Sequence, residues 1–243
     1  MRLIKIFTFT FAGHLHTKNN EPCQDFCAHL VTENCAAAAL ADGAGSARLS
    51  HIGARVATTT FTGYITAKPE RIFEDPELII NRVRLNLERN AKKRGVQISD
   101  LSSTLLGTAF YDGNLFLLHI GDGKALLISE GGAEILSEGK KGEFSNETYF
   151  TTSRDPNPEV VRRRIAHPHP FSVILMSDGA CSLFLDMRGK KPAPVLHSII
   201  SLMDSQPQEK IRRSLKRALK NIEPHRRHDD ISLAIMKFGG ELS

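Results

Sequence analysis

The chain has 243 residues, of which 41% are hydrophobic and 24% charged, and its formal net charge is +5. This is the composition of a soluble globular protein, and no run of 18 apolar residues is present, which argues against a membrane-spanning helix. The basic excess is mild and lacks the interleaved aromatic residues of nucleic-acid-binding surfaces, so we expect neither a membrane nor a nucleic acid as partner.

The four cysteines, at positions 23, 27, 35 and 181, form no C-x-x-C pair and show no zinc-type Cys/His spacing. We therefore expect free thiols and a location in a reducing cytoplasm. The N-terminal segment alternates with the period of a strand and lacks a small-residue cleavage site, which indicates a strand rather than a signal peptide. No linker-like segment divides the chain, and we expect one domain over residues 1–243.

Apolar spacing and turn residues predict the elements of the first half of the chain. Strands are expected over residues 3–11 and 26–41, the second folded as a hairpin around Thr32–Asn34. Helical spacing predicts one helix from Ser50 to about Ala67 and another from about Pro76 to Arg94. We expect these two helices to be antiparallel and joined by a short loop that contains a proline.

The middle of the chain is rich in predicted strands. Alternating apolar residues up to residue 137 are interrupted at Asp112-Gly113-Asn114, Gly121-Asp122-Gly123 and Gly131-Gly132, which predicts a meander of hairpins. Residues 138–170 are polar, rich in proline and poorly periodic. We expect them to form a long surface excursion, and such segments often act as lids or substrate-binding flaps.

The last third begins with a buried strand, "FSVILM", that leads to Asp178 and is followed by two further predicted helices. Basic residues concentrate in "RRR" at 162–164, "RGKK" at 188–191 and "KIRRSLKRALK" at 210–220. In the last of these the apolar residues recur at helical spacing, so the basic residues form the solvated face of a helix. A basic surface of this kind favours anionic partners such as phosphopeptides. The sequence "ISLAIMKF" predicts the final strand.

Aspartates stand at the ends of three hydrophobic strands, at Asp42, at Asp178 and at the pair Asp229–Asp230. Two more follow polar or turn segments, at Asp25 and Asp122. Any one of them can be an Asp-Gly turn or a helix cap. Several carboxylates at one edge of the sheets, however, cannot all stay ionised without a counter-ion, and Mg²⁺ or Mn²⁺ is the usual one. Two such ions about 3.5–4 Å apart produce a nucleophilic hydroxide and hold phosphate oxygens.

Five motifs follow one another in the order "NNEPCQD", "ADGAGS", "STLLGTAF…GDGK", "MSDG" and "DDISL". Their order and wording resemble the metal-dependent PP2C-type (PPM) protein serine/threonine phosphatases, especially the shorter bacterial members, from about Gly13 to Phe238. The resemblance implies an α+β fold, a four-layer α-β-β-α sandwich with two central antiparallel sheets flanked by helix pairs. It also implies hydrolysis of phosphoserine and phosphothreonine on proteins, with a Ser/Thr kinase or its target as partner.

The resemblance implies a dinuclear Mg²⁺ or Mn²⁺ centre. Asp42 would bridge the two ions and be central to catalysis, and the carbonyl of Gly43 would bind one of them, where only a bare backbone approaches so closely. Asp178 and Asp229 would bind the second ion.

Further residues are expected around these ligands. Asp25 would act in catalysis by orienting metal-bound water, and Asp122 would help Asp178 to hold a third ion. Asp230 stands where the family usually has Asn and is expected to support Asp229, although the choice between the two as ligand stays open.

The sequence departs from the family pattern at three positions. Gln24 replaces a metal-binding Glu and is expected to contact the ion or its water, and Ala44 replaces the His proposed as general acid. Asn20 stands where the family has its phosphate-binding Arg, and Lys18 and Arg48 are further candidates for holding phosphate. The histidines near these motifs are His14, His16 and His51.

Two other functions are alternatives to the phosphatase. A catalytically weak or inactive pseudophosphatase that binds phosphopeptides as a regulatory module is favoured by Gln24, Asn20 and Ala44, but the retained aspartates oppose it because a dead site has little use for unneutralised carboxylates. An aspartyl-phosphate hydrolase of the haloacid dehalogenase type needs Asp-x-Asp at a strand end, and "DGAG" lacks the second Asp.

Overall fold

The computed structural model describes residues 4–140, 148–165, 170–186 and 191–239. Two five-stranded sheets form its centre, and all their strand pairs are antiparallel. The first sheet has the order β1 (Ile4–Phe11), β10 (Ile231–Phe238), β9 (Phe171–Met176), β6 (Lys124–Ser129), β7 (Gly132–Ser137). The second has the order β2 (Phe26–Val31), β3 (Cys35–Ala41), β4 (Leu105–Tyr111), β5 (Asn114–Ile120), β8 (Glu159–Arg164).

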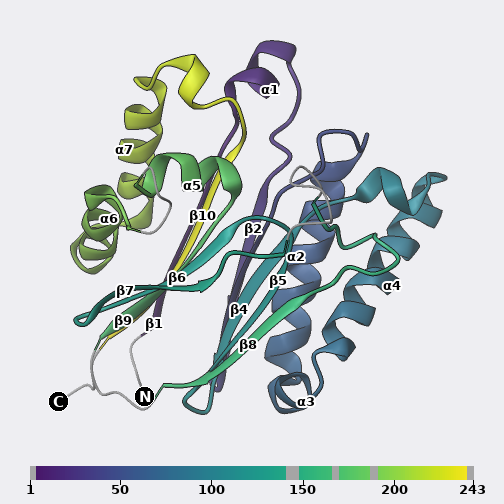
Figure 1. Ribbon diagram of the computed structural model, residues 1–243, viewed down its shortest axis with the longest axis horizontal. Coiled ribbons are helices and arrows are strands. Elements are labelled where there is room, and N and C mark those ends of the chain that lie inside the picture. Colours follow the sequence, from purple (N-terminus) through teal and green to yellow (C-terminus); the bar gives the residue numbers. More distant parts are fainter. Residues whose placement is uncertain (1–3, 141–147, 166–169, 187–190, 240–243) are drawn as a thin grey trace.

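Helices cover the outer face of each sheet. Over the first sheet lie α5 (Asp178–Phe184), α6 (Pro194–Ser205) and α7 (Gln208–Lys220), and over the second lie α2 (Ser50–Ala67), α3 (Pro69–Glu74) and α4 (Glu77–Arg94) (Figure 1). Short helical segments complete the chain at α1 (His14–Asn19), η1 (Ile98–Leu101) and η2 (Pro224–Arg226). The expected α-β-β-α sandwich is confirmed.

Three apolar clusters hold these layers together, one between the sheets and one between each sheet and its helices. The run "CAAAALA" of β3 is buried throughout, because α2 packs tightly on this sheet. A Cβ atom on Gly107 of β4 would lie 2.5 Å from the ring of Phe61 in α2. Small residues in the sheet thus let α2 approach closely, and this brings the N-terminal end of α2 beside the loop that follows β3.

Most predicted elements of the first half are confirmed, including the β2–β3 hairpin and the end of α4 at Gly95, whose φ is +66°. Pro69 ends α2, as expected from the effect of proline on the residue before it. Pro69 does not lead into a simple loop, however. Pro69 is the first residue of α3, where a missing N–H is tolerated, so that a short helix joins α2 to α4.

The prediction of a hairpin turn at Gly121-Asp122-Gly123 is wrong. The strand before it, β5, pairs with β4 and β8 in the second sheet, whereas the strand after it, β6, pairs with β7 and β9 in the first. Asp122 therefore lies where the chain crosses from one sheet to the other. The alternation of apolar and polar residues shows that two strands are present, but it does not show with which strand each of them pairs.

The excursion expected at 138–170 contains β8, an edge strand of the second sheet, and its residues 141–147 and 166–169 lie outside the described part. The sequence of β8, "EVVRRR", has too few apolar residues to stand out as a strand. In the described part of the chain from Asp178 onward there are three α-helices rather than the two predicted, and α1 was not predicted.

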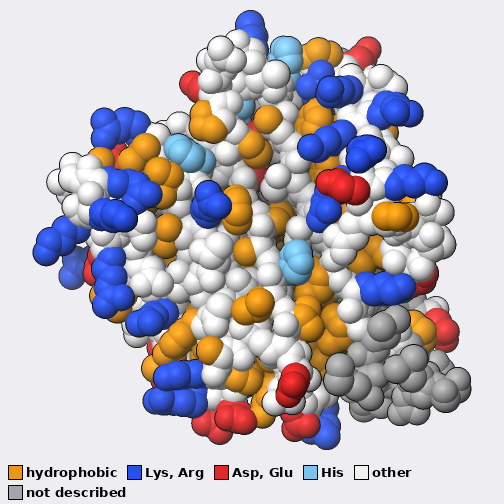
Figure 2. Space-filling view, turned by 180° about the vertical axis from the view of Figure 1, so that it is seen from behind, with side chains coloured by type: hydrophobic (Ala, Val, Ile, Leu, Met, Phe, Trp, Pro, Cys, Tyr) orange, Lys and Arg blue, Asp and Glu red, His pale blue; other side chains and the backbone are white. Residues whose placement is uncertain are grey.

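The basic residues of 210–220 lie on α7, which buries Ile211, Leu215 and Leu219, as the spacing predicted. Figure 2 shows Lys and Arg side chains gathered over the two helical flanks, with few in the middle of that face. In the basic segment 188–191, only Lys191 belongs to the described residues. None of the described helices is long and apolar enough to cross a membrane.

Candidate metal centre

Asp42 is held at the end of β3 by backbone pairing that continues past the strand. The Asp42 N–H donates to Thr104 Oγ1 at 2.8 Å, and the Thr104 N–H donates to the Asp42 carbonyl, also at 2.8 Å. Two residues further on, the Ala44 N–H donates to the Ser102 carbonyl at 3.0 Å. The main chain around Asp42 is therefore fixed, and its carboxylate projects from a rigid support.

Gly43 is required by the packing around it. A Cβ atom at this position would lie 2.7 Å from Cβ of Ser50, at the start of α2, and 2.9 Å from the carbonyl oxygen of Gln24. Both distances are too short for any side chain. The close approach of α2 and of the Gln24 segment thus explains why the strand is followed by glycine at this point.

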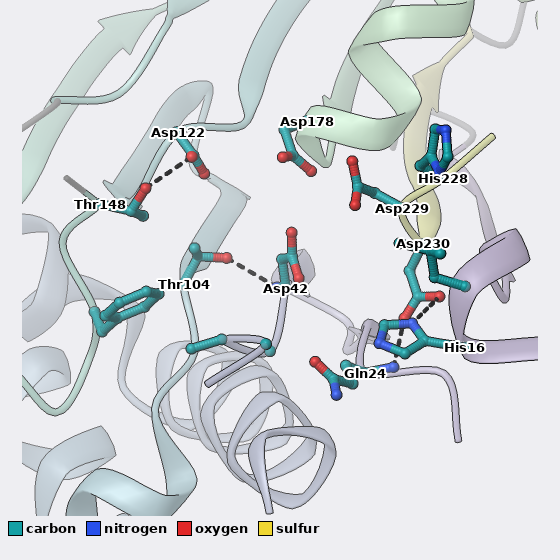
Figure 3. Close-up of a pocket in the computed structure, with 15 residues that line it drawn as sticks. His16, Gln24, Asp42, Thr104, Asp122, Thr148, Asp178, His228, Asp229 and Asp230 are labelled. Carbon is teal, nitrogen blue, oxygen red and sulfur yellow. Dashed lines mark hydrogen bonds and ion pairs between the residues drawn. The ribbon is translucent and has the colours of Figure 1, made fainter. Parts of the chain in front are cut away.

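Five of the predicted aspartates line a single hollow, which we call the acidic cleft. The carboxylate of one of them, Asp230, is engaged in hydrogen bonds, and the other four face the hollow. Its volume is about 350 Å³, and Asp42, Asp122, Asp178 and Asp229 line it. They come from the end of β3, the crossover between β5 and β6, the start of α5 and the loop before β10, and Figure 3 shows their carboxylates around one shared space. Segments far apart in sequence therefore place like charges together, as predicted.

The crowding changes the titration of these groups. Burial raises the pKa of Asp42 well above its ordinary value, and the charges of Asp25 and Asp178 raise it further. Although residue 178 is exposed, desolvation in the cleft also raises the pKa of Asp178, and the charge of Asp122 adds to the effect. Without a counter-ion these carboxylates resist ionisation, which is the behaviour of a site suited to a cation.

Asp25 is buried next to Asp42, with a relative exposure of 4%. Burial raises its pKa to about 7, against an opposing effect of the nearby Ser232 hydroxyl. Neither oxygen of Asp25 makes a hydrogen bond of ordinary geometry with a described residue, and the same holds for the buried Oε1 of Gln24. Buried acceptors without donors are costly. Gln24 lines the cleft and suits a cation or water there, whereas Asp25, which does not line the cleft, suits a proton or water beside Asp42.

Asp229 and Asp230 are neighbours with different surroundings. Asp230 is buried, and its Oδ1 accepts hydrogen bonds from the Gly13 N–H at 2.7 Å and from His16 Nδ1 at 2.9 Å. Its Oδ2 accepts from the Gln24 N–H at 2.6 Å. Asp230 therefore ties the N-terminal segment to β10. Asp229 is exposed and points into the acidic cleft (Figure 3).

The donor set of the cleft fits a hard divalent cation, because it consists of carboxylate, carbonyl and amide oxygens. Within the described residues, no three His, Cys, Asp or Glu side chains are arranged so that they could hold one ion together. Each ion would therefore take few protein ligands, with backbone carbonyl and water completing its shell, as is usual for Mg²⁺.

The sequence matches the protein phosphatase 2C family over residues 12–220. The chain belongs to this family. The match confirms the resemblance seen in the motifs and the expected enzyme class, a protein phosphatase. No curated protein matches the sequence.

Solved structures share the fold of this phosphatase 2C at low identity. The catalytic domain of the serine threonine protein phosphatase PstP, solved with two manganese ions, is 14% identical, with a TM-score of 0.68 over 98% of this chain and 100% of that one. Stp1 from Staphylococcus aureus is 13% identical, with a TM-score of 0.67 over 98% and 96%. RsbX, in complex with magnesium, is 16% identical, with a TM-score of 0.61 over 98% and 100%.

The candidates for phosphate binding lie away from the acidic cleft of this phosphatase 2C. Asn20 ends α1 with φ at +61° and is exposed, and neither it nor the exposed Lys18 and Arg48 lines the cleft. Among the described residues that line the cleft there is no Lys or Arg. The structure therefore does not bring these candidates to the carboxylates.

Of the three histidines singled out in the sequence, only His16 lines the cleft, and its Nδ1 is bonded to Asp230. His228 lines the cleft as well and was missed by the sequence analysis. Its position directly before the Asp229–Asp230 pair was the signal that would have found it.

The excursion after β7 contributes two residues to the cleft, Thr148 and Phe150. Thr148 Oγ1 donates a hydrogen bond to Asp122 Oδ2 at 2.9 Å (Figure 3). The Thr151 N–H and hydroxyl both donate to the Ser103 carbonyl, at 2.9 and 3.0 Å. This part of the excursion is thus anchored beside Asp42 and Asp122 and forms a wall of the cleft.

Proposed function

We propose that this protein hydrolyses phosphoserine and phosphothreonine on proteins at a centre of two Mg²⁺ or Mn²⁺ ions, with a third ion at Asp122. The observation that carries the proposal is the acidic cleft, where aspartates from four separate segments face one space without a Lys or Arg among the described lining residues. The two manganese ions bound by PstP and the magnesium bound by RsbX support the choice of metals.

Asp42, the Gly43 carbonyl, Asp178 and Asp229 would hold the ions. The metals would lower the pKa of bound water and neutralise the phosphate oxygens. Thr104 keeps the main chain of Asp42 in place, and the Asp230 hydrogen bonds hold the Gln24 segment against the loop that carries Asp229.

Asp25 would hold a proton beside Asp42. With its pKa raised to about 7, it is poised between its two protonation states near neutral pH. A group of this kind is suited to accept a proton from water near the cleft and to orient that water. Its two oxygens make no hydrogen bond of ordinary geometry with a described residue and are available for this task.

Three broader features belong to the same proposal. The domain extends over residues 1–243, the partners are phosphorylated proteins such as a Ser/Thr kinase or its target, and the location is cytoplasmic. The four cysteines are free, which agrees with a reducing compartment.

A pseudophosphatase that binds phosphopeptides is the second candidate. It is favoured by the absence of Lys and Arg from the described lining of the cleft, together with Gln24 and Ala44 at positions where the family has a ligand and a proton donor. Such a protein would still bind phosphopeptides but would not turn them over.

Hydrolysis assays separate the two candidates. Purified protein is tested on an aryl phosphate and on a phosphoserine peptide, with Mn²⁺ and with chelator. Metal-dependent turnover of both supports the phosphatase, whereas peptide binding without turnover identifies the pseudophosphatase. The control variant is Asp112→Asn, which removes a carboxylate at an exposed turn. Asp112 has φ at +45°, a conformation that Asn tolerates.

A further inference from the structure

A second hollow adjoins the acidic cleft, and we call it the cationic groove. It has a volume of about 350 Å³ and shares His228 and Asp229 with the cleft. The other residues that line it come from α5 and from the segment around η2, namely Gly179, Ser182, Leu183, His225, Arg226 and Arg227.

The two hollows differ in charge. The cleft has no described Lys or Arg in its lining, whereas Arg226 and Arg227 line the groove. Two histidines line each hollow, and His225 of the groove lies 3.5 Å from the Glu223 carboxylate. Asp229, at the border, is the only acidic residue among those described in the lining of the groove. An ion bound in the cleft would neutralise Asp229, which leaves the groove cationic.

The arginines of the groove have different partners. Arg227 Nε donates to the Ile222 carbonyl at 3.0 Å, which holds this side chain close to the protein. Arg226 is exposed and makes no side-chain hydrogen bond or ion pair with any residue in the described ranges. The groove thus offers one fixed guanidinium and one that is available to bind an anion.

The wall between the hollows is firmly packed. A Cβ atom on Gly179 would lie 2.2 Å from the Asp230 carbonyl oxygen, so that the start of α5 lies directly against the loop before β10. Ser182 Oγ donates to the Gly179 carbonyl at 2.7 Å, and Leu183 gives the groove an apolar part. A ligand can thus meet both charged and apolar surface in the groove.

We propose that the cationic groove binds an acidic group of the substrate, a carboxylate side chain or a second phosphate, next to the phosphorylated residue in the cleft. This inference rests on the proposed function, which places the phosphorylated residue at the carboxylates. An extended peptide advances about 3.3 Å per residue, so that two hollows with a common wall suit residues within a few positions of each other. Guanidinium groups bind carboxylate and phosphate through charge-assisted hydrogen bonds.

The test compares three peptides on the full chain with Mn²⁺. Each has a non-hydrolysable phosphonate analogue of phosphoserine, flanked by Gln, by Glu or by a second copy of the same analogue, and binding is measured by fluorescence anisotropy. The matching phosphoserine peptides are assayed for hydrolysis. Two variants are tested, Arg226→Gln and the double variant Arg226→Gln/Arg227→Gln. The control is Arg89→Gln, which replaces an exposed arginine on α4, in the opposite helical layer.

We expect the wild type and Arg89→Gln to bind a flanked anionic peptide about three- to tenfold more tightly than the Gln peptide, the scale of charge-assisted contacts at a partly exposed site. Arg226→Gln should remove most of this preference and the double variant all of it. The ratio of the binding affinities for the Glu peptide and for the peptide with two phosphonates identifies which anion the groove prefers.

Equal binding of all three peptides by the wild type, or a preference unchanged in both Arg226 variants, would overturn the inference. A binding preference that depends on Arg226, without hydrolysis of any peptide, would support the groove while refuting the phosphatase proposal. Because Arg226 has no partner in the described part of the chain, Arg226→Gln should leave the melting temperature unchanged, so that a loss of preference cannot be ascribed to misfolding.

Discussion

Two buried carboxylates, Asp25 directly before β2 and Asp230 directly before β10, have opposite surroundings. Asp230 accepts three hydrogen bonds and joins the N-terminal segment to β10. Neither oxygen of Asp25 makes a hydrogen bond of ordinary geometry with a described residue, and the nearby Ser232 hydroxyl offsets only part of the cost of its burial. Both aspartates are 4% exposed. Burial alone therefore does not separate a structural acid from a functional one. The number of donors around it does, because a carboxylate without donors is kept only where something else, such as a cation or a proton, compensates its charge.

The largest effect on activity is expected when Asp42, the carboxylate next to Asp25, is replaced. Asp42→Ala should lower the rate of phosphate ester hydrolysis by about a thousandfold or more, since a metal centre contributes several kcal/mol to catalysis. The metal-free variant should be at least as stable as the wild type, because one member of a repelling cluster is removed. Kinetics with Mn²⁺ and thermal unfolding with chelator measure the two effects. Full activity in the variant or in chelator would refute the metal centre.

Replacing Asp230 should instead lower the stability of the fold. Asp230→Ala leaves the N–H groups of Gly13 and Gln24 without their acceptor, and we expect the free energy of unfolding to fall by about 2–4 kcal/mol. Asp230→Asn, which keeps one oxygen acceptor, should lose less. Denaturant unfolding measures both variants. Equal stability of Asp230→Ala and wild type would show that these hydrogen bonds have no net effect on the fold.

Asp25 predicts how stability depends on pH. Its pKa is about 7 in the folded protein and near 3.8 when unfolded, so that the folded state binds more protons between these values. The stabilisation is present below about pH 4 and is lost as the pH rises towards 7. The metal-free protein should thus become less stable over this range, and Asp25→Asn should flatten the decline. A decline as steep in Asp25→Asn as in wild type would assign it to other groups.

The smallest effect is expected at Gln24, whose buried Oε1 has no described donor. Gln24→Glu adds a negative charge beside the cleft, which should tighten Mn²⁺ binding by about tenfold, the lower end of the effect of residues around a metal site. The same charge should make the metal-free protein less stable. Calorimetric titration with Mn²⁺ tests the first effect and unfolding with chelator the second. Unchanged affinity would place residue 24 outside the metal's surroundings.

The sequence alone was enough to predict the family, the α-β-β-α sandwich, the hairpin before Asp42, and α2, α4 and the amphipathic character of α7. The helices and the hairpin depend on local information, because apolar periodicity, prolines and glycines act over a few residues. The family and the sandwich were expected from the resemblance of the five motifs to the phosphatase family. The aspartates at strand ends were also visible in the sequence, since a polar residue after a hydrophobic run marks the edge of a sheet.

Only the tertiary structure decided the partners of these elements. It placed Asp122 on the crossover between the two sheets, separated the buried Asp230 from the exposed Asp229, and brought His228 and Thr148 to the cleft. It also placed Arg226 in the groove that adjoins the cleft at Asp229, whereas Asn20 and Arg48 do not line the cleft. Local patterns cannot contain these facts. Which strand a segment pairs with, and whether a side chain meets donors or open space, depends on chain segments that lie more than a hundred residues away in sequence, such as Gly13 and Asp230.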